Sequence, residues 1–102
     1  MRCSMCTVKS PLLNTSTVLV RQNAAVKKIL AERDRQDDKW GMHNHSPEKW
    51  LSILGEEFGE ACKAALHGNR KKFLREMVQI SAVALAALEF ANLSISEDNR
   101  RD

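Results

Sequence analysis

The stretch at residues 50–61, WLSILGEEFGEA, decides the fold class because it combines apolar side chains at helical spacing with three glutamates. At about 100° per residue, one helix face carries Trp50, Ile53, Leu54, Ala61, Ala64 and Ala65. Glu57 falls in the middle of that face, Glu60 lies at its edge, and Glu56 points nearer to solvent. An unpaired carboxylate in an apolar seam is costly, so it must be protonated, ion-paired or bound to a metal.

The helix expected at about residues 71–91 repeats this pattern. Glu76 shares a stripe with apolar side chains, and Gln79 lies about one turn further along; the apolar members are Phe73, Ile80, Val83 and Ala87. Two helices that each bring oxygen-bearing side chains to one seam suit a hard cation such as magnesium. Ion pairs with Lys63, Arg70 or Arg75 are the alternative for each glutamate taken singly. A di-iron site needs Glu-x-x-His on two helices, and the partner of Glu76 is not histidine.

Signals along the rest of the chain predict an all-α fold, a helical bundle of three main helices. The first helix is expected at about 18–38, with Trp40-Gly41 closing it. The second is expected from Pro47 to Leu66, with Ser46 as its N-cap. Together with the third helix these segments define one domain over 18–94. Residues 1–17 are expected to form an N-terminal tail and residues 95–102 a C-terminal tail.

Composition supports helices and self-association. The 102 residues are 43% hydrophobic and 28% charged, with no Tyr, four Gly and two Pro, and so few breakers and aromatics favour helices over strands. Between Met77 and Leu88 only Gln79 and Ser81 are polar. A helix that is apolar all round must be covered on all sides. A homodimer or homotetramer is therefore expected.

Charge and cysteine usage exclude several classes of protein. The formal net charge of +3 is too mild to predict nucleic-acid binding. No stretch approaches the roughly 20 apolar residues of a membrane span. The cysteines Cys3, Cys6 and Cys62 are odd in number, and Cys3-Ser-Met-Cys6 has no second pair at zinc-finger spacing. A cytoplasmic protein that acts on neither nucleic acid nor membrane is expected.

The glutamate pattern resembles that of a known family. Glu56-Glu57-x-x-Glu60, fifteen further residues and then Glu76-x-x-Gln79 is similar to the EExxE and ExxD motifs of the MazG-like all-α nucleoside triphosphate pyrophosphohydrolases. The likeness covers about residues 24–93 and includes Lys39-Trp40-Gly41. One position departs from the common pattern, since Gln79 stands where that pattern has Asp. An amide oxygen still coordinates magnesium, but the site loses one negative charge.

The resemblance implies a function and a set of site residues. It implies Mg²⁺-dependent hydrolysis of a nucleoside triphosphate, a dNTP or a non-canonical NTP, to a monophosphate and pyrophosphate, as nucleotide-pool house-cleaning, with Mn²⁺ as a possible substitute. Metal ligands would be Glu57, Glu60, Glu76 and Gln79, and the catalytic residues Glu56 and Glu57, with Glu56 orienting or deprotonating the attacking water. The candidates for phosphate binding are Arg35, Lys39, Lys63, Arg70, Lys71 and Lys72.

Other residues near the predicted site have two interpretations each. Trp40 and Trp50 either stack on a base or serve as structural anchors, and Asn92 either hydrogen-bonds a base or caps its helix. His43 and His45 are interpreted as polar loop residues, because magnesium prefers oxygen ligands. Two other functions also stay open: a non-enzymatic helical interaction or regulatory protein, and a nucleotide-binding member of the family without catalysis.

Overall fold

The described part of the chain consists of three α-helices, and no strand occurs in it. The computed structural model describes the backbone of residues 15–41 and 43–101, with side chains as far as Ala91. The helices are α2 at Thr15–Trp40, α3 at Pro47–Leu66 and α4 at Arg70–Arg101. The prediction of an all-α fold with three main helices is confirmed.

The helix ends differ from the sequence-based expectation at both ends of the domain. α2 begins at Thr15, so residues 15–17 are helical, whereas the remainder of the expected N-terminal tail lies outside the described residues. α4 continues to Arg101, so the segment expected as a C-terminal tail is helical as far as that residue. Residues 70–101 contain no Gly or Pro, and a polar composition alone does not end a helix.

The start of α3 follows the predicted capping chemistry. The Ser46 hydroxyl accepts a hydrogen bond of 3.2 Å from the Lys49 backbone N–H, and Pro47 follows the cap. Gly41 adopts a φ of 77°, a left-handed conformation, directly after α2, and its N–H donates to the Asp37 carbonyl at 2.8 Å. These two local signals therefore set the two ends of the short connection between α2 and α3.

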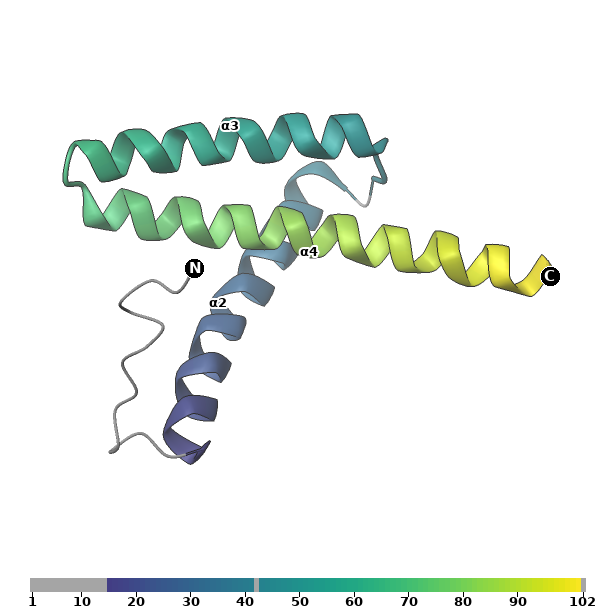
Figure 1. Ribbon diagram of the computed structural model, residues 1–102, viewed down its shortest axis with the longest axis horizontal. Helices are drawn as coiled ribbons and strands as arrows, with labels where there is room; N and C mark the ends of the chain where they lie inside the picture. The colour runs from purple at the N-terminus through teal and green to yellow at the C-terminus, as the bar shows by residue number, and fades with distance from the viewer. Residues whose placement is uncertain (1–14, 42, 102) are drawn as a thin grey trace, which may run out of the picture.

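A tight turn joins α3 to α4. Gly68 has a φ of 68° and donates its N–H to the Ala65 carbonyl at 3.1 Å, which ends α3. Asn69 then caps α4, because its side-chain oxygen accepts from the Lys72 N–H at 3.1 Å. The two helices consequently run antiparallel and side by side as a hairpin (Figure 1).

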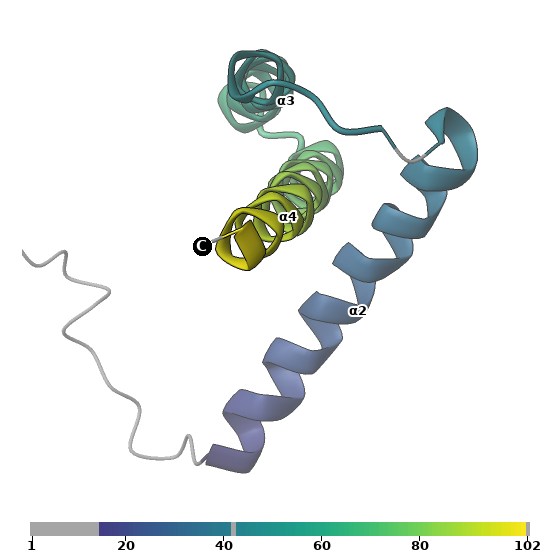
Figure 2. The ribbon, with the colours of Figure 1, turned by 90° about the vertical axis from the view of Figure 1, so that its right-hand side faces the viewer.

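The first helix stands apart from this hairpin. α2 crosses α4 and packs on it, but makes no packing contact with α3 (Figures 1 and 2). The N-terminal half of α2 extends away from α4 (Figure 2). Its C-terminal half lines the space that α2 encloses with both α3 and α4.

The apolar core is thin for a chain of this composition. Among the described residues its buried apolar members are five small or medium side chains, Ala61, Ala64, Ala82, Val83 and Ala86. Leu66 is 85% exposed, and Ala65, expected on the core face of α3, is exposed as well. The described residues thus leave much apolar surface in contact with solvent. Across the same residues, no helix combines the length and the apolar character needed to cross a membrane.

Candidate functional site

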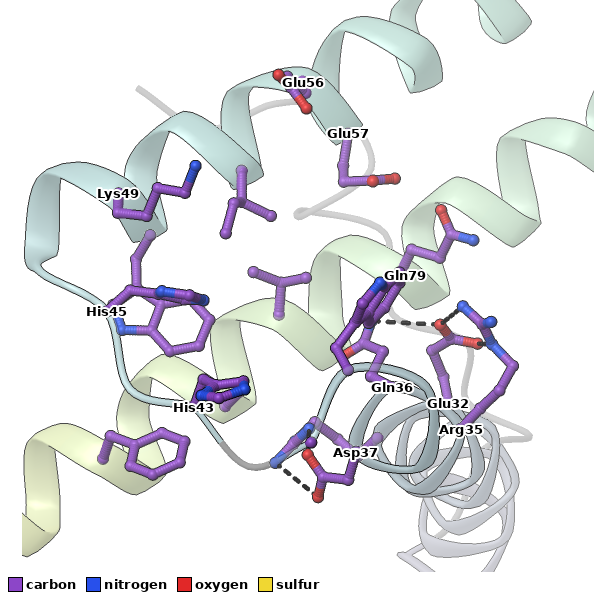
Figure 3. Close-up of a pocket in the computed structure, with 18 residues that line it drawn as sticks. Glu32, Arg35, Gln36, Asp37, His43, His45, Lys49, Glu56, Glu57 and Gln79 are labelled. Atoms are coloured by element: carbon purple, nitrogen blue, oxygen red, sulfur yellow. Dashed lines mark hydrogen bonds and ion pairs between the residues drawn. The ribbon is translucent and has the colours of Figure 1, made fainter.

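A pocket of ≈ 570 Å³ lies where the C-terminal half of α2 and the following loop meet α3 and α4. This volume lies within the usual range for small-molecule sites. Polar side chains and aromatic rings share its wall (Figure 3). The lining residues used below are Glu32, Arg33, Arg35, Asp37, Trp40, His45, Lys49, Trp50, Glu56, Glu57, Gln79 and Phe90.

One end of the pocket gathers oxygen atoms from α3 and α4. Glu57 and Gln79 point toward one another across the two helices (Figure 3). With its amide nitrogen turned inward, Gln79 donates to Glu57 Oε2 at 2.6 Å and to Glu76 Oε2 at 3.1 Å. With its amide oxygen turned inward, side-chain oxygens of Gln79, Glu57 and Glu76 face one another, and a proton kept by one carboxylate or a bound cation makes this arrangement favourable. Glu76 is 7% exposed, so its carboxylate has little solvent to screen it.

This crowding shifts the titration of Glu57. Burial, a hydrogen bond with Glu76 and the charge of Glu76 together raise the pKa of Glu57 from 4.5 to about 7, and the charges of Glu56 and Glu60 act in the same direction. Loss of the last proton at neutral pH therefore leaves adjacent negative charges in the seam. A cation at this place would relieve that repulsion.

We expect Glu57→Gln to stabilise the metal-free protein at pH 8 and to leave its stability unchanged at pH 4. Below the unfolded pKa of 4.5 both states carry the proton; between 4.5 and about 7 only the folded state keeps it, so the parent loses stability as pH rises. Glutamine carries no such charge. Thermal melts in a chelator at pH 4, 6 and 8 measure the difference, with the exposed Asp34→Asn as control. A difference that did not grow with pH would contradict the assignment.

Glu60, the third predicted carboxylate ligand, pairs with two lysines in the structure. Glu60 Oε2 accepts a hydrogen bond from Lys72 Nζ at 3.2 Å, and its Oε1 lies 3.8 Å from Lys63 Nζ. The hydrogen bond from Lys72, together with the charges of Lys72 and Lys63, lowers the pKa of Glu60. The structure therefore brings together Glu57, Glu76 and Gln79, whereas Glu60 lies in an exposed ion pair at the edge of that group.

The carboxylate and amide oxygens at this end are of the ligand type that magnesium prefers. Adjacent ligands of an ideal octahedron at 2.0–2.1 Å stand roughly 2.9 Å apart, and the two separations at Gln79 are 2.6 and 3.1 Å. No three His, Cys, Asp or Glu side chains among the described residues group closely enough to hold a metal. The third donor at this end is the Gln79 amide, which is none of these four residue types.

The other end of the pocket is aromatic. The Trp50 ring stacks near Phe90 with centroids 6.3 Å apart, and the His45 ring meets Trp50 edge-on at 4.7 Å. Trp50 Nε1 donates to Asn44 Oδ1 at 3.3 Å. Because Trp50 is only half-buried and lines the pocket, its ring belongs to both the packing and the pocket wall.

A buried arginine that the sequence did not single out ties α2 to α4. Arg33 is 6% exposed; it donates to Asp37 at 2.9 and 3.3 Å and to Glu89 at 3.1 and 3.3 Å. Its spacing from Val26 and Leu30, seven and three residues earlier, places it on an apolar helix face. That spacing is the signal that could have identified it.

The other pocket cations differ in how strongly carboxylates hold them. Arg35 donates to Glu32 at 2.6 and 2.9 Å, and the hydrogen bond from Arg35 lowers the pKa of Glu32. Lys49 has no ion pair within the described part of the chain, and its helical spacing with Ile53 and Glu56 could have placed it on the pocket face. Lys49 is therefore the lining cation most available to a ligand.

Several predicted substrate-binding residues lie outside the pocket wall. Trp40 lines it and is 55% exposed, but Lys39 lies over the Trp40 ring, 4.9 Å from its centroid, without lining the pocket. The remaining predicted cations that do not line it are Lys63, Arg70, Lys71 and Lys72. The backbone of Asn92 belongs to α4, but its side chain is outside the described residues.

Comparisons with family models, with curated proteins and with solved structures find no match to this chain.

Proposed function

We propose that this protein hydrolyses a magnesium-bound nucleoside triphosphate between its α- and β-phosphates, releasing a monophosphate and pyrophosphate. The observation that carries the proposal is the convergence of Glu57, Glu76 and Gln79, two of which, Glu57 and Gln79, line one end of a pocket whose other end is aromatic. The sequence resemblance to the MazG-like pyrophosphohydrolases points in the same direction. A dNTP or a non-canonical NTP is the proposed substrate class.

The spacing along α3 supports a nucleotide in this pocket. Trp50 and Glu57 lie seven residues apart on one helix face, a rise of about 10 Å at 1.5 Å per residue. This separation suits a molecule with a flat base at one end and phosphates at the other. Trp50 would stack on the base, and Lys49 would contact phosphate oxygens at the open side.

The charge of the pocket supports a substrate that arrives with a metal. Its lining holds four carboxylates, from Glu32, Asp37, Glu56 and Glu57, against three cations, two of which are already ion-paired. A bare triphosphate would be repelled from this wall. Bound magnesium, or manganese in its place, supplies neutralisation of phosphate charge and a lowered pKa of a coordinated water.

The residues of the chain divide the remaining tasks. Glu57, Glu76 and the Gln79 amide oxygen would hold the ion, joined by Glu60 after it leaves Lys72. Exposed Glu56, on the pocket wall, would orient the attacking water and accept its proton. Because Gln79 is neutral where an aspartate would be charged, the end of the pocket at Glu57 carries one negative charge fewer.

We further propose that the fold is completed by a second copy or by three more copies of the chain. The core of the described residues contains no fully buried large side chain, and Leu19, Val20, Leu74 and Leu88 are half or more exposed. A homodimer or homotetramer would cover this apolar surface.

A substrate panel tests the proposed activity. We expect pyrophosphate release from at least one canonical or damaged NTP or dNTP at micromolar enzyme, with Mg²⁺ or Mn²⁺ and not in a chelator. A parallel thermal melt with Mg²⁺ and a non-hydrolysable dNTP analogue should show stabilisation that neither Mg²⁺ nor analogue gives alone. Stabilisation without turnover would indicate a nucleotide-binding protein without catalysis. Neither response would favour a non-enzymatic helical interaction protein.

A further inference from the structure

We propose that a basic groove between α2 and α4 is a docking site for an acidic amphipathic helix of a partner protein. The groove has a volume of ≈ 450 Å³ and is separate from the pocket described above, since no residue lines both. It lies where the N-terminal half of α2 diverges from α4 (Figure 2). The inference does not depend on nucleotide hydrolysis.

Each wall of the groove is one stripe of a helix. The wall from α2 is formed by Arg21, Ala24, Ala25, Lys28 and Ile29. The wall from α4 is formed by Leu74, Met77, Val78 and Ser81. Both sets include the spacing i, i+3, i+4 and i+7, so each wall presents a single helix face over about two turns. A third helix laid between two such faces meets side chains at its own helical spacing.

The apolar part of the groove is open to a partner. Leu74 is 60% exposed and Met77 41%, and the small side chains of Ala24 and Ala25 leave room for a larger side chain. An amphipathic helix buries its apolar face against such a surface. A sugar–phosphate backbone has no apolar side chain to bury there, and a flat bilayer surface does not reach into a groove between two helices. The shape and chemistry therefore favour a helix over nucleic acid or membrane.

The charged side chains that line the groove are both cations. Arg21 and Lys28 are exposed, and neither has an ion pair in the described part of the chain. They lie seven residues apart on α2, a rise of about 10 Å, so two carboxylates seven residues apart on a helix that runs along α2 can meet both. Arg70, also exposed, continues the stripe of the α4 wall one turn before Leu74. An acidic helix is therefore complementary to this groove.

The carboxylates of the chain face other surfaces. Residues 15–31 contain no Asp or Glu. Residues 70–88 contain one, Glu76, which is 7% exposed and lies about 150° around α4 from the centre of the groove stripe. Glu32, the first carboxylate of α2, lines the other pocket and pairs with Arg35. The groove is therefore basic although the formal net charge of the chain is only +3.

Charge also disfavours the occupants that the chain itself could supply. Residues 1–14 contain two basic residues and no Asp or Glu, so the groove would repel them. The same groove of a second copy would bring Arg21 and Lys28 against like charges. Of the exposed residues assigned above to self-association, only Leu74 lines the groove. The complementary occupant is therefore a different, acidic chain.

Fluorescence anisotropy with a labelled model peptide tests the docking site on the full chain. The probe has three repeats of Leu-Glu-Glu-Leu-Ala-Gln-Glu, so its leucines share one helix face and glutamates flank that face. We expect saturable binding that weakens as salt rises from about 0.1 to 1 M. The same peptide with Lys in place of Glu, and a scrambled acidic peptide without an apolar face, should each bind at least about tenfold more weakly.

Neighbouring positions on α2 supply matched control variants. Lys28 lines the groove and Lys27 does not, although both are exposed. Lys28→Glu should therefore weaken binding of the probe at least about fivefold, and Lys27→Glu less than about twofold. Ala25→Glu, in the groove wall, should weaken binding in the same way, whereas Asn23→Glu, on the opposite side of α2, should not. All four positions are exposed, so helicity by circular dichroism should be kept.

Three outcomes would overturn the docking site. The first is the absence of saturable binding by the acidic peptide. The second is an equal loss of binding in Lys27→Glu and Lys28→Glu, which would indicate attraction by overall charge. The third is tighter binding of a single-stranded oligonucleotide, or of vesicles that contain phosphatidylglycerol, with the same dependence on Lys28. That result would assign the groove to nucleic acid or to a membrane surface instead.

Discussion

Glu57→Gln should reduce pyrophosphate release at least about 100-fold while leaving the protein folded. Loss of a hydrogen-bond partner one shell away from a metal costs 10- to 100-fold, so loss of a direct oxygen ligand should cost more. Glutamine keeps the size of the side chain and one of its two oxygens. It removes the negative charge that Glu57 contributes beside Gln79 and Glu76. The measurement is kcat/KM at saturating Mg²⁺ for the best substrate of the panel.

The stability of the same variant distinguishes a site role from a structural one. Because burial and Glu76 raise the pKa of Glu57 to about 7, metal-free Glu57→Gln should melt higher than the parent at pH 8. A more stable protein with less activity cannot have failed through misfolding. Asp34→Asn, exposed and outside the pocket, should match the parent in rate. Near-parental turnover by Glu57→Gln would refute the site assignment.

Glu60 offers a second check on the same site. Its 3.2 Å hydrogen bond to Lys72 is an exposed ion pair, a type of interaction worth little, so release of the carboxylate toward the metal costs little. Glu60→Gln should therefore lose activity about as strongly as Glu57→Gln, whereas Lys72→Met should retain most of it. Equal and mild losses in both variants would show that Glu60 only pairs with Lys72.

Arg33→Met should lower the stability of the protein by about 2 kcal/mol, because four charge-assisted hydrogen bonds are lost and two carboxylates are left side by side. The figure is kept below that of a fully buried pair because the side chains of Asp37 and Glu89 are 33% and 44% exposed. For a domain of this size, the melting temperature should fall by about 10 °C. Thermal and urea melts at pH 7.5 measure the change.

Arg35→Met is the matched control for this prediction. It removes the same residue type two positions away on α2, but Arg35 is exposed and pairs with Glu32 three residues earlier on the same helix. Such an exposed pair within one helix contributes little to stability, so Arg35→Met should melt close to the parent. Equal destabilisation by the two variants would contradict the view that Arg33 joins α2 to α4.

Much of the fold could be read from local sequence signals. Ser46-Pro47 fixed the start of α3, Gly41 the end of α2 and Gly68 the turn, because caps and left-handed glycines depend on neighbours within one helical turn. The extent of α4 to Arg101 could not be read from composition, because a polar segment without breakers stays helical. The prediction of the buried face of α3 was right at Ala61 and Ala64 and wrong at Ala65. Ala65 lies at the edge of that face, where the position of α4 decides whether a side chain is buried.

The sequence by itself determined three helices and the anomaly of glutamates on apolar faces, since both follow from a fixed angle per residue. Only the tertiary structure decided which oxygens meet. The antiparallel packing of α3 on α4 brings together Glu57, Glu76 and Gln79, while the side chain of Glu60 pairs with a lysine twelve residues away. It also decided that Arg33 reaches Glu89, fifty-six residues further along. Distances between helices depend on packing angles and on the conformations of long side chains. The helical period predicts neither of these, because it gives only the face on which a residue lies.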